Sequence, residues 1–101
     1  MSAACYILYS VSLDKYYIGA TAHDIDIRII KHNSSFYGTS KYTSKTSDWE
    51  LFLVIETLDY SHALRIEAKI KKMKSKIYIL NLNKYEEMRI LLYNKTLHRR
   101  E

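Results

Sequence analysis

The spacing of apolar residues predicts that the chain opens with two short strands. Tyr, Ile, Leu and Val are concentrated over residues 5–11 and again over residues 16–21, and a mainly polar tetrad at residues 12–15 separates the two runs. Strands favour such residues, and a short polar connection between two of them is typical of a β-hairpin. We therefore expect two antiparallel strands at the start of the fold.

A short helix, a long loop and a third strand are predicted next. Isoleucines recur at helical spacing from residue 25 to residue 30, Asp24 or Asp26 can accept the free amides of a first turn, and Asn33 ends the run. Residues 34–48 carry Ser and Thr with almost no aliphatic side chain, which indicates an exposed and functional loop. The nearly unbroken apolar run at 49–56 predicts a strand in a central position, covered on both faces.

The second half of the chain is predicted to be mainly helical. Asp59 caps a helix that runs to about Ser75, and residues 77–82 are expected to be extended or coil before a closing helix at 84–94. The residues expected to face inward are Ala63, Ile66, Ile70, Met73, Met88, Leu91 and Leu92. The predicted fold is α+β, a small three-stranded antiparallel sheet flanked by about three helices. It forms one domain over residues 1–95 with a short loose tail at 96–101.

Length and charge narrow the function. A chain of 101 residues with 48% hydrophobic content can build one modest core, and proline is absent. The net charge of +5 and the pI near 9.3 favour a polyanionic partner. No stretch is apolar enough to cross a membrane. The single Cys5 and the lack of a signal-peptide pattern favour a reducing cytoplasm.

Glu67 is the most informative residue, because it falls on the apolar side of the best helix beside Ala63 and Ile70. Moving a carboxylate out of water costs on the order of several kcal/mol, unless a cation or a hydrogen bond compensates. Two interpretations fit this position. Glu67 forms an i,i+4 ion pair with Lys71, or it binds a metal ion.

Four further side chains have the chemistry of a phosphate-cleaving site. Arg28 and His32 are four residues apart on the first helix and therefore project side by side, so that one can hold a phosphate oxygen and the other can move a proton. Tyr6 and Tyr17 lie on the two hairpin strands, where their hydroxyl groups can reach one end of the sheet. Gly19 would let a backbone or a phosphate approach closely. The alternative is that Arg28 and His32 are solvated surface residues and that the two tyrosines only pack in the fold.

In order and spacing, these residues resemble the GIY-YIG endonuclease family, in particular its compact single-domain members. The second half of the family signature stands as Tyr17-Ile18-Gly19, and Ala4-Cys5-Tyr6 stands where Gly-Ile-Tyr would be, keeping the tyrosine. Arg28 with His32, and Glu67 in the segment 67–71, match the later motifs. The resemblance covers nearly the whole chain and implies a divalent-metal-dependent DNA endonuclease, structure-specific in DNA repair or recombination.

The resemblance also implies roles for the site residues. Glu67 would hold one divalent ion, Mg²⁺ or Mn²⁺, and a lone carboxylate suits Mg²⁺, which keeps most of its waters. Arg28 would stabilise the negative charge on the phosphate in the transition state. Tyr6 would act as the base, with His32 and Tyr17 orienting it or relaying its proton. Asn81 would correspond to a late asparagine of the family that supports the site.

Lysines should provide the grip on the DNA backbone, which is independent of sequence and weakens with salt. The lysines concerned are Lys41, Lys45, Lys69, Lys71, Lys72 and Lys74. A solvated helix face is the alternative. A homodimer, or a partner protein that supplies substrate specificity, would complement a chain with one active site.

Two rival functions remain compatible with the sequence. The first is a nucleic-acid-binding module that kept the fold and lost cleavage, which would not need Glu67 or a divalent ion. The second is a small interaction protein whose basic helix binds RNA, with the tyrosines serving only as core. It would prefer RNA and be indifferent to Arg28→Ala.

Overall fold

The computed structural model describes residues 3–34 and 46–97. Its elements are β1 (Ala4–Ser10), β2 (Lys15–Thr21), α1 (Ile25–Asn33), β3 (Trp49–Glu56), α2 (Tyr60–Met73), α3 (Lys76–Lys84) and α4 (Glu86–Lys95). The three strands form one antiparallel sheet in the order β2-β1-β3. The predicted α+β class is confirmed, with four helices in the described part of the chain where about three were expected.

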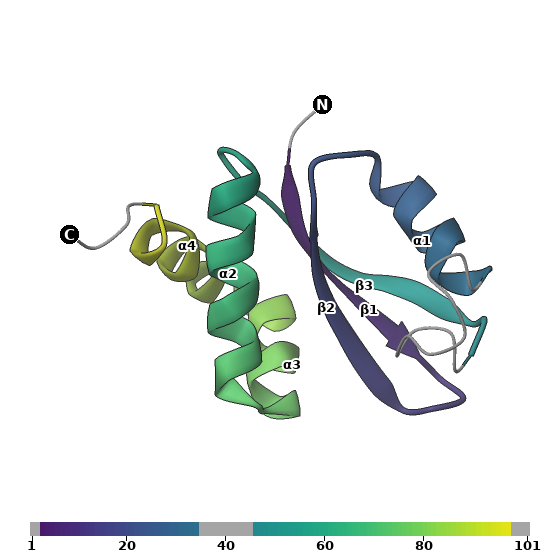
Figure 1. Ribbon diagram of the computed structural model, residues 1–101. Coiled ribbons are helices and arrows are strands. Elements are labelled where there is room, and N and C mark those ends of the chain that lie inside the picture. Colours follow the sequence, from purple (N-terminus) through teal and green to yellow (C-terminus); the bar gives the residue numbers. More distant parts are fainter. Residues whose placement is uncertain (1–2, 35–45, 98–101) are drawn as a thin grey trace.

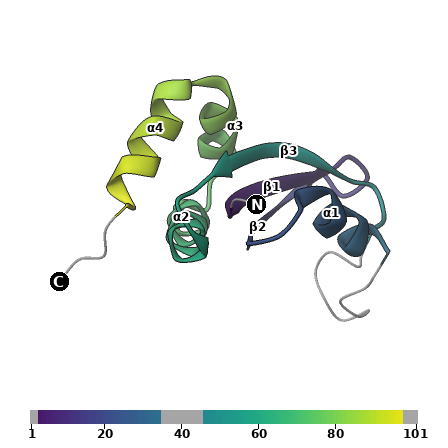
Figure 2. The same cartoon turned by 90° about the horizontal axis from the view of Figure 1, so that it is seen from above.

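The central strand β1 separates two apolar layers. Helix α1 lies on one side of the sheet, and α2, α3 and α4 lie on the other (Figures 1 and 2). Successive side chains of a strand point to opposite faces. Cys5 and Ile7 accordingly pack in the larger core with residues of the later helices such as Ile66, whereas Tyr6 packs with Trp49 on the side of α1.

Strand β3 is an edge strand, so the prediction that it is central was wrong. Leu51 and Leu53 pair with neighbouring residues of β1, which leaves one extra residue in β3 and makes a β-bulge. A bulge reverses which face the following residues occupy. Trp49 therefore packs toward α1 while Ile55 packs toward the later helices. This switch of faces makes the sequence of an edge strand resemble that of a strand buried on both sides.

Residues 77–82 were expected to be extended or coil, and this prediction was also wrong, because they lie within α3. The hydroxyl of Ser75 caps the helix by accepting a hydrogen bond from the backbone N–H three residues later. Ile79 and Leu82 are buried and three residues apart, which is helical spacing. The branched apolar residues of the segment are typical of strands, but their burial follows helical spacing.

Most of the predicted inward positions are buried or partly buried, but two are not. Met73 is 51% exposed at the last residue of α2, and Leu91 is 59% exposed on α4. Helix α4 presents Leu92 to the core, with Met88 packed against it. The neighbouring position on the helix, Leu91, is turned away by about 100°.

The segment after α4 begins with two anchored residues, although residues 96–101 were expected to be loose. Thr96 is buried, and its Oγ1 lies 3.0 Å from Nε2 of His62 on α2. Arg65 donates from Nε to the carbonyl oxygen of Thr96 at 2.7 Å and from Nη2 to that of Leu97 at 2.9 Å. These bonds fix the end of α4 against α2.

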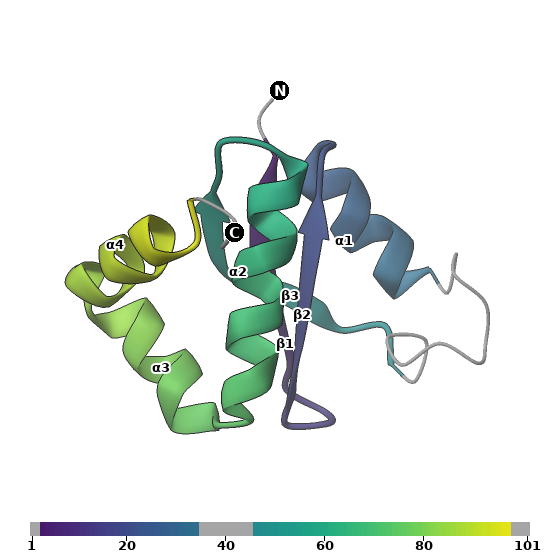
Figure 3. The same cartoon turned by 60° about the vertical axis from the view of Figure 1, so that its left-hand side comes forward.

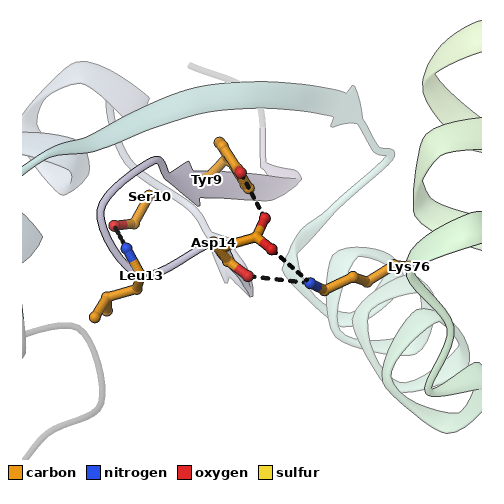
Figure 4. A network of polar contacts seen from close by, with 5 residues as sticks. All are labelled: Tyr9, Ser10, Leu13, Asp14 and Lys76. Atoms are coloured by element: carbon orange, nitrogen blue, oxygen red, sulfur yellow. Dashed lines mark hydrogen bonds and ion pairs between the residues drawn. The ribbon is translucent and has the colours of Figure 1, made fainter.

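The hairpin turn is joined to the start of α3 by polar contacts (Figure 4). Asp14, which has a φ of 51°, accepts a hydrogen bond from Oη of Tyr9 at 2.6 Å. Nζ of Lys76 donates to the carbonyl oxygen of Asp14 at 3.1 Å and lies 3.3 Å from its Oδ2. Oγ of Ser10 accepts from the backbone N–H of Leu13 at 3.1 Å. The turn is therefore tied to an element 62 residues away.

Candidate active site

The hydroxyl group of Tyr6 lies at the centre of a polar cluster beneath α1. Tyr6 is fully buried on β1. Its Oη lies 3.0 Å from Nε2 of His32 and accepts a hydrogen bond from Nη2 of Arg28 at 3.3 Å. Arg28 and His32 lie 22 and 26 positions after Tyr6 in the sequence, and all three residues meet at the Tyr6 oxygen atom. The structure brings together three of the residues that the sequence singled out.

Helix α1 delivers Arg28 and His32 to this point. Asp24 is its N-cap, accepting from the backbone N–H of Asp26 at 2.8 Å, which decides between the two candidate caps. Arg28 and His32 then lie one turn apart on the face of α1 that meets the sheet. His32 is 2% exposed. His32 is therefore positioned by packing, and Arg28, which is partly buried, is held by its hydrogen bond to Tyr6, so the two are not a solvated surface pair.

Asn33 fixes the other end of α1, and this role was missed in the sequence. Its Nδ2 donates to the carbonyl oxygen of Trp49 at 2.9 Å, and its Oδ1 accepts from the Trp49 backbone N–H at 2.7 Å. The side-chain amide therefore clamps α1 to the first residue of β3. The sequence interpretation used Asn33 only as a helix end, because a partner 16 residues away leaves no local signal.

Tyr17 and Gly19 complete the cluster from β2. The Tyr17 ring centroid lies 4.8 Å from that of His32 and 6.3 Å from that of Tyr6. Gly19 is the register partner of Tyr6. A Cβ atom at position 19 would lie 2.6 Å from both Cζ and Oη of Tyr6. A close approach at Gly19 is thus made by the Tyr6 side chain.

Burial, followed by the nearby Arg28 guanidinium, lowers the pKa of His32 from 6.5 to about 4. His32 is therefore neutral at physiological pH, with one ring nitrogen protonated and the other free. With the proton on Nε2, His32 and Arg28 both donate to the Tyr6 oxygen. This arrangement stabilises negative charge on that oxygen, as a base derived from tyrosine requires.

Glu67 lies on α2, on the opposite side of the sheet from α1 (Figures 1 and 2). Its side chain is 17% exposed, and Oε2 lies 2.7 Å from Nζ of Lys71, one turn later. In the described part of the chain, no hydrogen bond or ion pair joins Glu67 to Tyr6, Arg28 or His32. The i,i+4 ion pair that was one of the two interpretations of Glu67 is present. The structure therefore groups Glu67 with Lys71 and not directly with the Tyr6 cluster.

The Glu67 carboxylate nevertheless lies close to the central strand. Burial and, second, the charge of Glu67 raise the pKa of the Cys5 thiol to about 12. Cys5 immediately precedes Tyr6 on β1, so Glu67 is near the strand that carries the cluster. Tyr60 precedes Glu67 by seven residues, which is two helical turns, and therefore shares its face of α2.

The residues around Glu67 fit a hydrated divalent ion better than a fully caged one. Among residues 3–34 and 46–97, no three His, Cys, Asp or Glu side chains converge in a way that could hold a metal ion. A site with one carboxylate, partly exposed to water, matches the preference of Mg²⁺ for keeping several of its waters. A cation bound there would displace the Lys71 ammonium from Glu67.

The predicted DNA-binding lysines fall into three groups. Lys41 and Lys45 lie outside the described residues. Lys69 and Lys72 are exposed on α2, and Lys74 is exposed at its left-handed C-cap. Lys71 is engaged by Glu67. The run of lysines is therefore available to a polyanion on α2, with the exception of the ammonium that neutralises Glu67.

Asn81, expected to support the site, lies within α3. Helix α3 packs on α4 and α2, on the opposite side of the sheet from α1 (Figures 1 and 2). The structure gives Asn81 no side-chain bond to the Tyr6 cluster in the described part of the chain. A supporting role of Asn81 stays a prediction.

Comparison with known proteins gives one match. The family model described as the GIY-YIG catalytic domain matches residues 2–86. The match includes β1, β2, α1, β3, α2 and α3, and therefore every residue of the Tyr6 cluster as well as Glu67. A search of curated proteins found no match, and neither did a search of solved structures. Separately, none of the helices in the described residues is long and apolar enough to cross a membrane.

Proposed function

This chain belongs to the GIY-YIG family of nucleases, and from that premise we propose that it is a divalent-metal-dependent DNA endonuclease. The observation that carries the proposal is the position of the Tyr6 hydroxyl, 3.0 Å from His32 Nε2 and 3.3 Å from Arg28 Nη2. The reaction is hydrolysis of a phosphodiester bond by in-line attack of water. DNA repair or recombination, with branched or flapped DNA as substrate, is the setting that we propose.

Tyr6 acts in this proposal as the general base, in its phenolate form. Proton transfer from a neutral phenol to His32 is unfavourable, because the pKa of His32, about 4, lies far below the ordinary phenol pKa of about 10. His32 therefore does not store the proton. Tyr6 instead releases its phenolic proton to solvent, and His32 and Arg28 donate hydrogen bonds to the resulting phenolate, which then takes a proton from the attacking water.

Arg28 stabilises the negative charge that develops on the phosphate in this proposal. The guanidinium has five N–H donors, so one can remain on Tyr6 while others face a phosphate oxygen. As hydroxide attacks phosphorus and the bond to the leaving oxygen breaks, negative charge grows on the phosphoryl oxygens. A partly buried, preorganised cation such as Arg28 is well placed to stabilise that charge. The leaving oxygen takes a proton from solvent.

Glu67 is the proposed ligand for Mg²⁺ or Mn²⁺. Bound there, the ion would supply positive charge to the scissile phosphate and its leaving oxygen. Lys71 is the residue that must give way, since its ammonium holds the carboxylate at 2.7 Å. Lys71 then becomes free to contact the DNA backbone. Loading of Glu67 and recruitment of Lys71 to DNA would thus occur together.

The proposal is tested by cleavage of end-labelled linear, flapped and four-way DNA in Mg²⁺, Mn²⁺ or chelator. Glu67→Gln keeps the size of the side chain and removes its charge, and Glu87→Gln is the matched control, because Glu87 is exposed in the first turn of another helix, α4. We expect cutting that requires a divalent ion, survives in Glu87→Gln and is lost in Glu67→Gln. Equal cutting by both variants would exclude Glu67 as the metal ligand.

A second candidate function is favoured by the Glu67–Lys71 ion pair. Because Lys71 satisfies the carboxylate without a metal, the same fold can serve as a nucleic-acid-binding module that does not cut. The cleavage assay separates the two functions. Intact DNA in every lane, together with retained binding by both variants, would favour the module or a missing partner protein.

The assembly is part of the proposal as well. A chain with one active site makes a double-strand cut most simply as a homodimer, or with a partner protein that positions the substrate. Sedimentation of the chain with and without flapped DNA tests the first alternative. A single monomeric species on DNA that is cut on both strands would contradict it.

A further inference from the structure

A cavity of about 390 Å³ adjoins the Tyr6 cluster at Arg28. This open pocket is lined by the end of β2, the connection to α1, α1 itself and the first turn of α2. Its lining residues are Ala20, Thr21, Ala22, His23, Arg28 and Tyr60. The volume falls within the roughly 300–1,000 Å³ of small-ligand sites. A cavity adjoining the proposed phosphate-binding arginine is placed to accept the next part of a nucleotide.

Thr21 and the aromatic ring of Tyr60 are the two features of the lining that matter for binding. Three consecutive small residues, Ala20, Thr21 and Ala22, leave the space open. The Thr21 hydroxyl is buried and accepts from the backbone N–H of His23 at 2.9 Å, which fixes the connection to α1. Tyr60 is 45% exposed. Core packing does not explain an aromatic ring so exposed at the mouth of the cavity.

We propose that this cavity binds the nucleoside next to the scissile phosphate, with its base stacked on the ring of Tyr60. This inference rests on the proposed nuclease function and specifies its substrate. Stacking on an aromatic side chain tolerates any base, since every base has a π-face. Arg28 lines the same cavity and holds the adjoining phosphate, so phosphate and base are bound by neighbouring side chains.

The position of Tyr60 on α2 relates the cavity to Glu67. Seven residues along a helix correspond to about 10 Å along its axis, at 1.5 Å per residue. Strand β2 lies between α2 and α1, and α2 runs alongside it (Figure 3). A nucleic-acid strand that follows α2 would reach Tyr60 with one base and Glu67 with a phosphate.

This mode of binding selects for DNA that is not fully paired. A base inside a duplex is stacked between its neighbours and must be extruded before it can reach a protein ring, which costs unstacking energy. A flap, a fork or a single strand offers an unpaired base without that cost. The cavity therefore favours substrates with an unpaired nucleotide beside the cut, whatever their sequence.

The first test measures binding of a fluorescent flapped oligonucleotide by anisotropy in chelator, so that it does not depend on cleavage. Tyr60→Ala removes the ring, Tyr60→Trp keeps one, and Tyr85→Ala is the matched control, because Tyr85 is 40% exposed on the distant corner between α3 and α4. We expect roughly 5- to 100-fold weaker binding by Tyr60→Ala. Tyr60→Trp and Tyr85→Ala should bind like the native chain. Equal affinity of the native chain and Tyr60→Ala would overturn the proposal.

The second test removes the base from the DNA. An abasic residue next to the cut should weaken binding to the native chain by the same factor as Tyr60→Ala, and should leave binding by Tyr60→Ala itself unchanged. Independent, multiplying losses would show that the base does not lie on Tyr60. If binding depends on Tyr60 but the chain never cuts DNA, the proposed cavity stands and the proposed nuclease function is refuted. If Tyr60→Ala cuts DNA with an unchanged KM, the nuclease function stands and the proposed role of the cavity is refuted.

Discussion

Replacing Gly19 with alanine adds one methyl group at the tightest point of the Tyr6 cluster. The new Cβ would lie 2.6 Å from Cζ and Oη of Tyr6, whereas ordinary contact begins at 3.4 Å. The tyrosine must therefore retreat by about 0.8 Å, the difference between these two distances, although it is fully buried and bonded through its hydroxyl. Overpacking of this kind costs ~1–3 kcal/mol. We expect Gly19→Ala to lower the free energy of unfolding by this amount, as measured by urea titration.

The same displacement of the Tyr6 hydroxyl should also lower the rate of DNA cleavage. A misplacement of about 1 Å at a reacting group costs on the order of 100-fold in rate. Gly19→Ala should therefore reduce the single-turnover rate about 100-fold while DNA affinity stays close to that of the native chain. The loss has a specific origin, since the methyl group acts by moving the Tyr6 hydroxyl away from His32 and Arg28.

A double-mutant cycle with Tyr6→Phe tests that origin. Because both changes act through one hydroxyl group, the double variant should cleave about as slowly as Tyr6→Phe alone. Two losses that multiply would show that Gly19 acts elsewhere. Native stability and rate in Gly19→Ala would refute the packing argument itself.

Three further predictions concern the surroundings of the site. His32 binds its proton far more weakly in the folded chain (pKa about 4) than in the unfolded chain (6.5), so its contribution to stability is complete above pH 6.5 and is lost as the pH falls toward 4. Between pH 7 and 4.5 the native chain should lose about 2 kcal/mol more than His32→Asn in urea titrations, and parallel pH curves would contradict this. Burial raises the pKa of Cys5 to about 12, so its thiol should resist a disulfide reagent at pH 8 until urea unfolds the chain, and rapid labelling of the folded chain would be inconsistent with that burial. Asn33→Ala removes both bonds to Trp49 and should cost ~1–3 kcal/mol in urea titration, against which an unchanged midpoint would count.

The parts of the fold that depend on local chemistry were predictable. Asp24 and Asp59 cap α1 and α2 at the positions where a carboxylate precedes a helical pattern. The hairpin followed from two apolar runs around a short polar turn. The position of β3 at the edge of the sheet was not predictable in this way, because it depends on pairing with β1 and on a bulge that only the pairing reveals.

In the candidate site, too, the features set by local spacing were predictable and those set by tertiary packing were not. The four-residue spacing of Arg28 and His32 placed them side by side, and this depends only on the helix. Their meeting with Tyr6 depends on which face of β1 turns toward α1, which tertiary packing decides. The partner of Glu67 was the nearest cation on its own helix, so local spacing predicted the ion pair. The relation of Glu67 to the cluster across β2 lies beyond any local pattern.

The central claim is that the Tyr6 hydroxyl, held by Arg28 and His32, activates the water that cuts DNA. Its most direct test is the single-turnover cleavage rate of Tyr6→Phe in Mg²⁺, with enzyme in excess over flapped DNA. Removing the oxygen removes the base and leaves the ring, so we predict a rate at least about 100-fold below native, in line with the 10²–10⁴-fold typical of general bases. DNA binding should be preserved, and stability should fall only by the ~1–3 kcal/mol that loss of the buried hydrogen bonds to His32 and Arg28 costs. A rate within about threefold of native, far inside that range, would contradict the mechanism and assign the activation of water to another group.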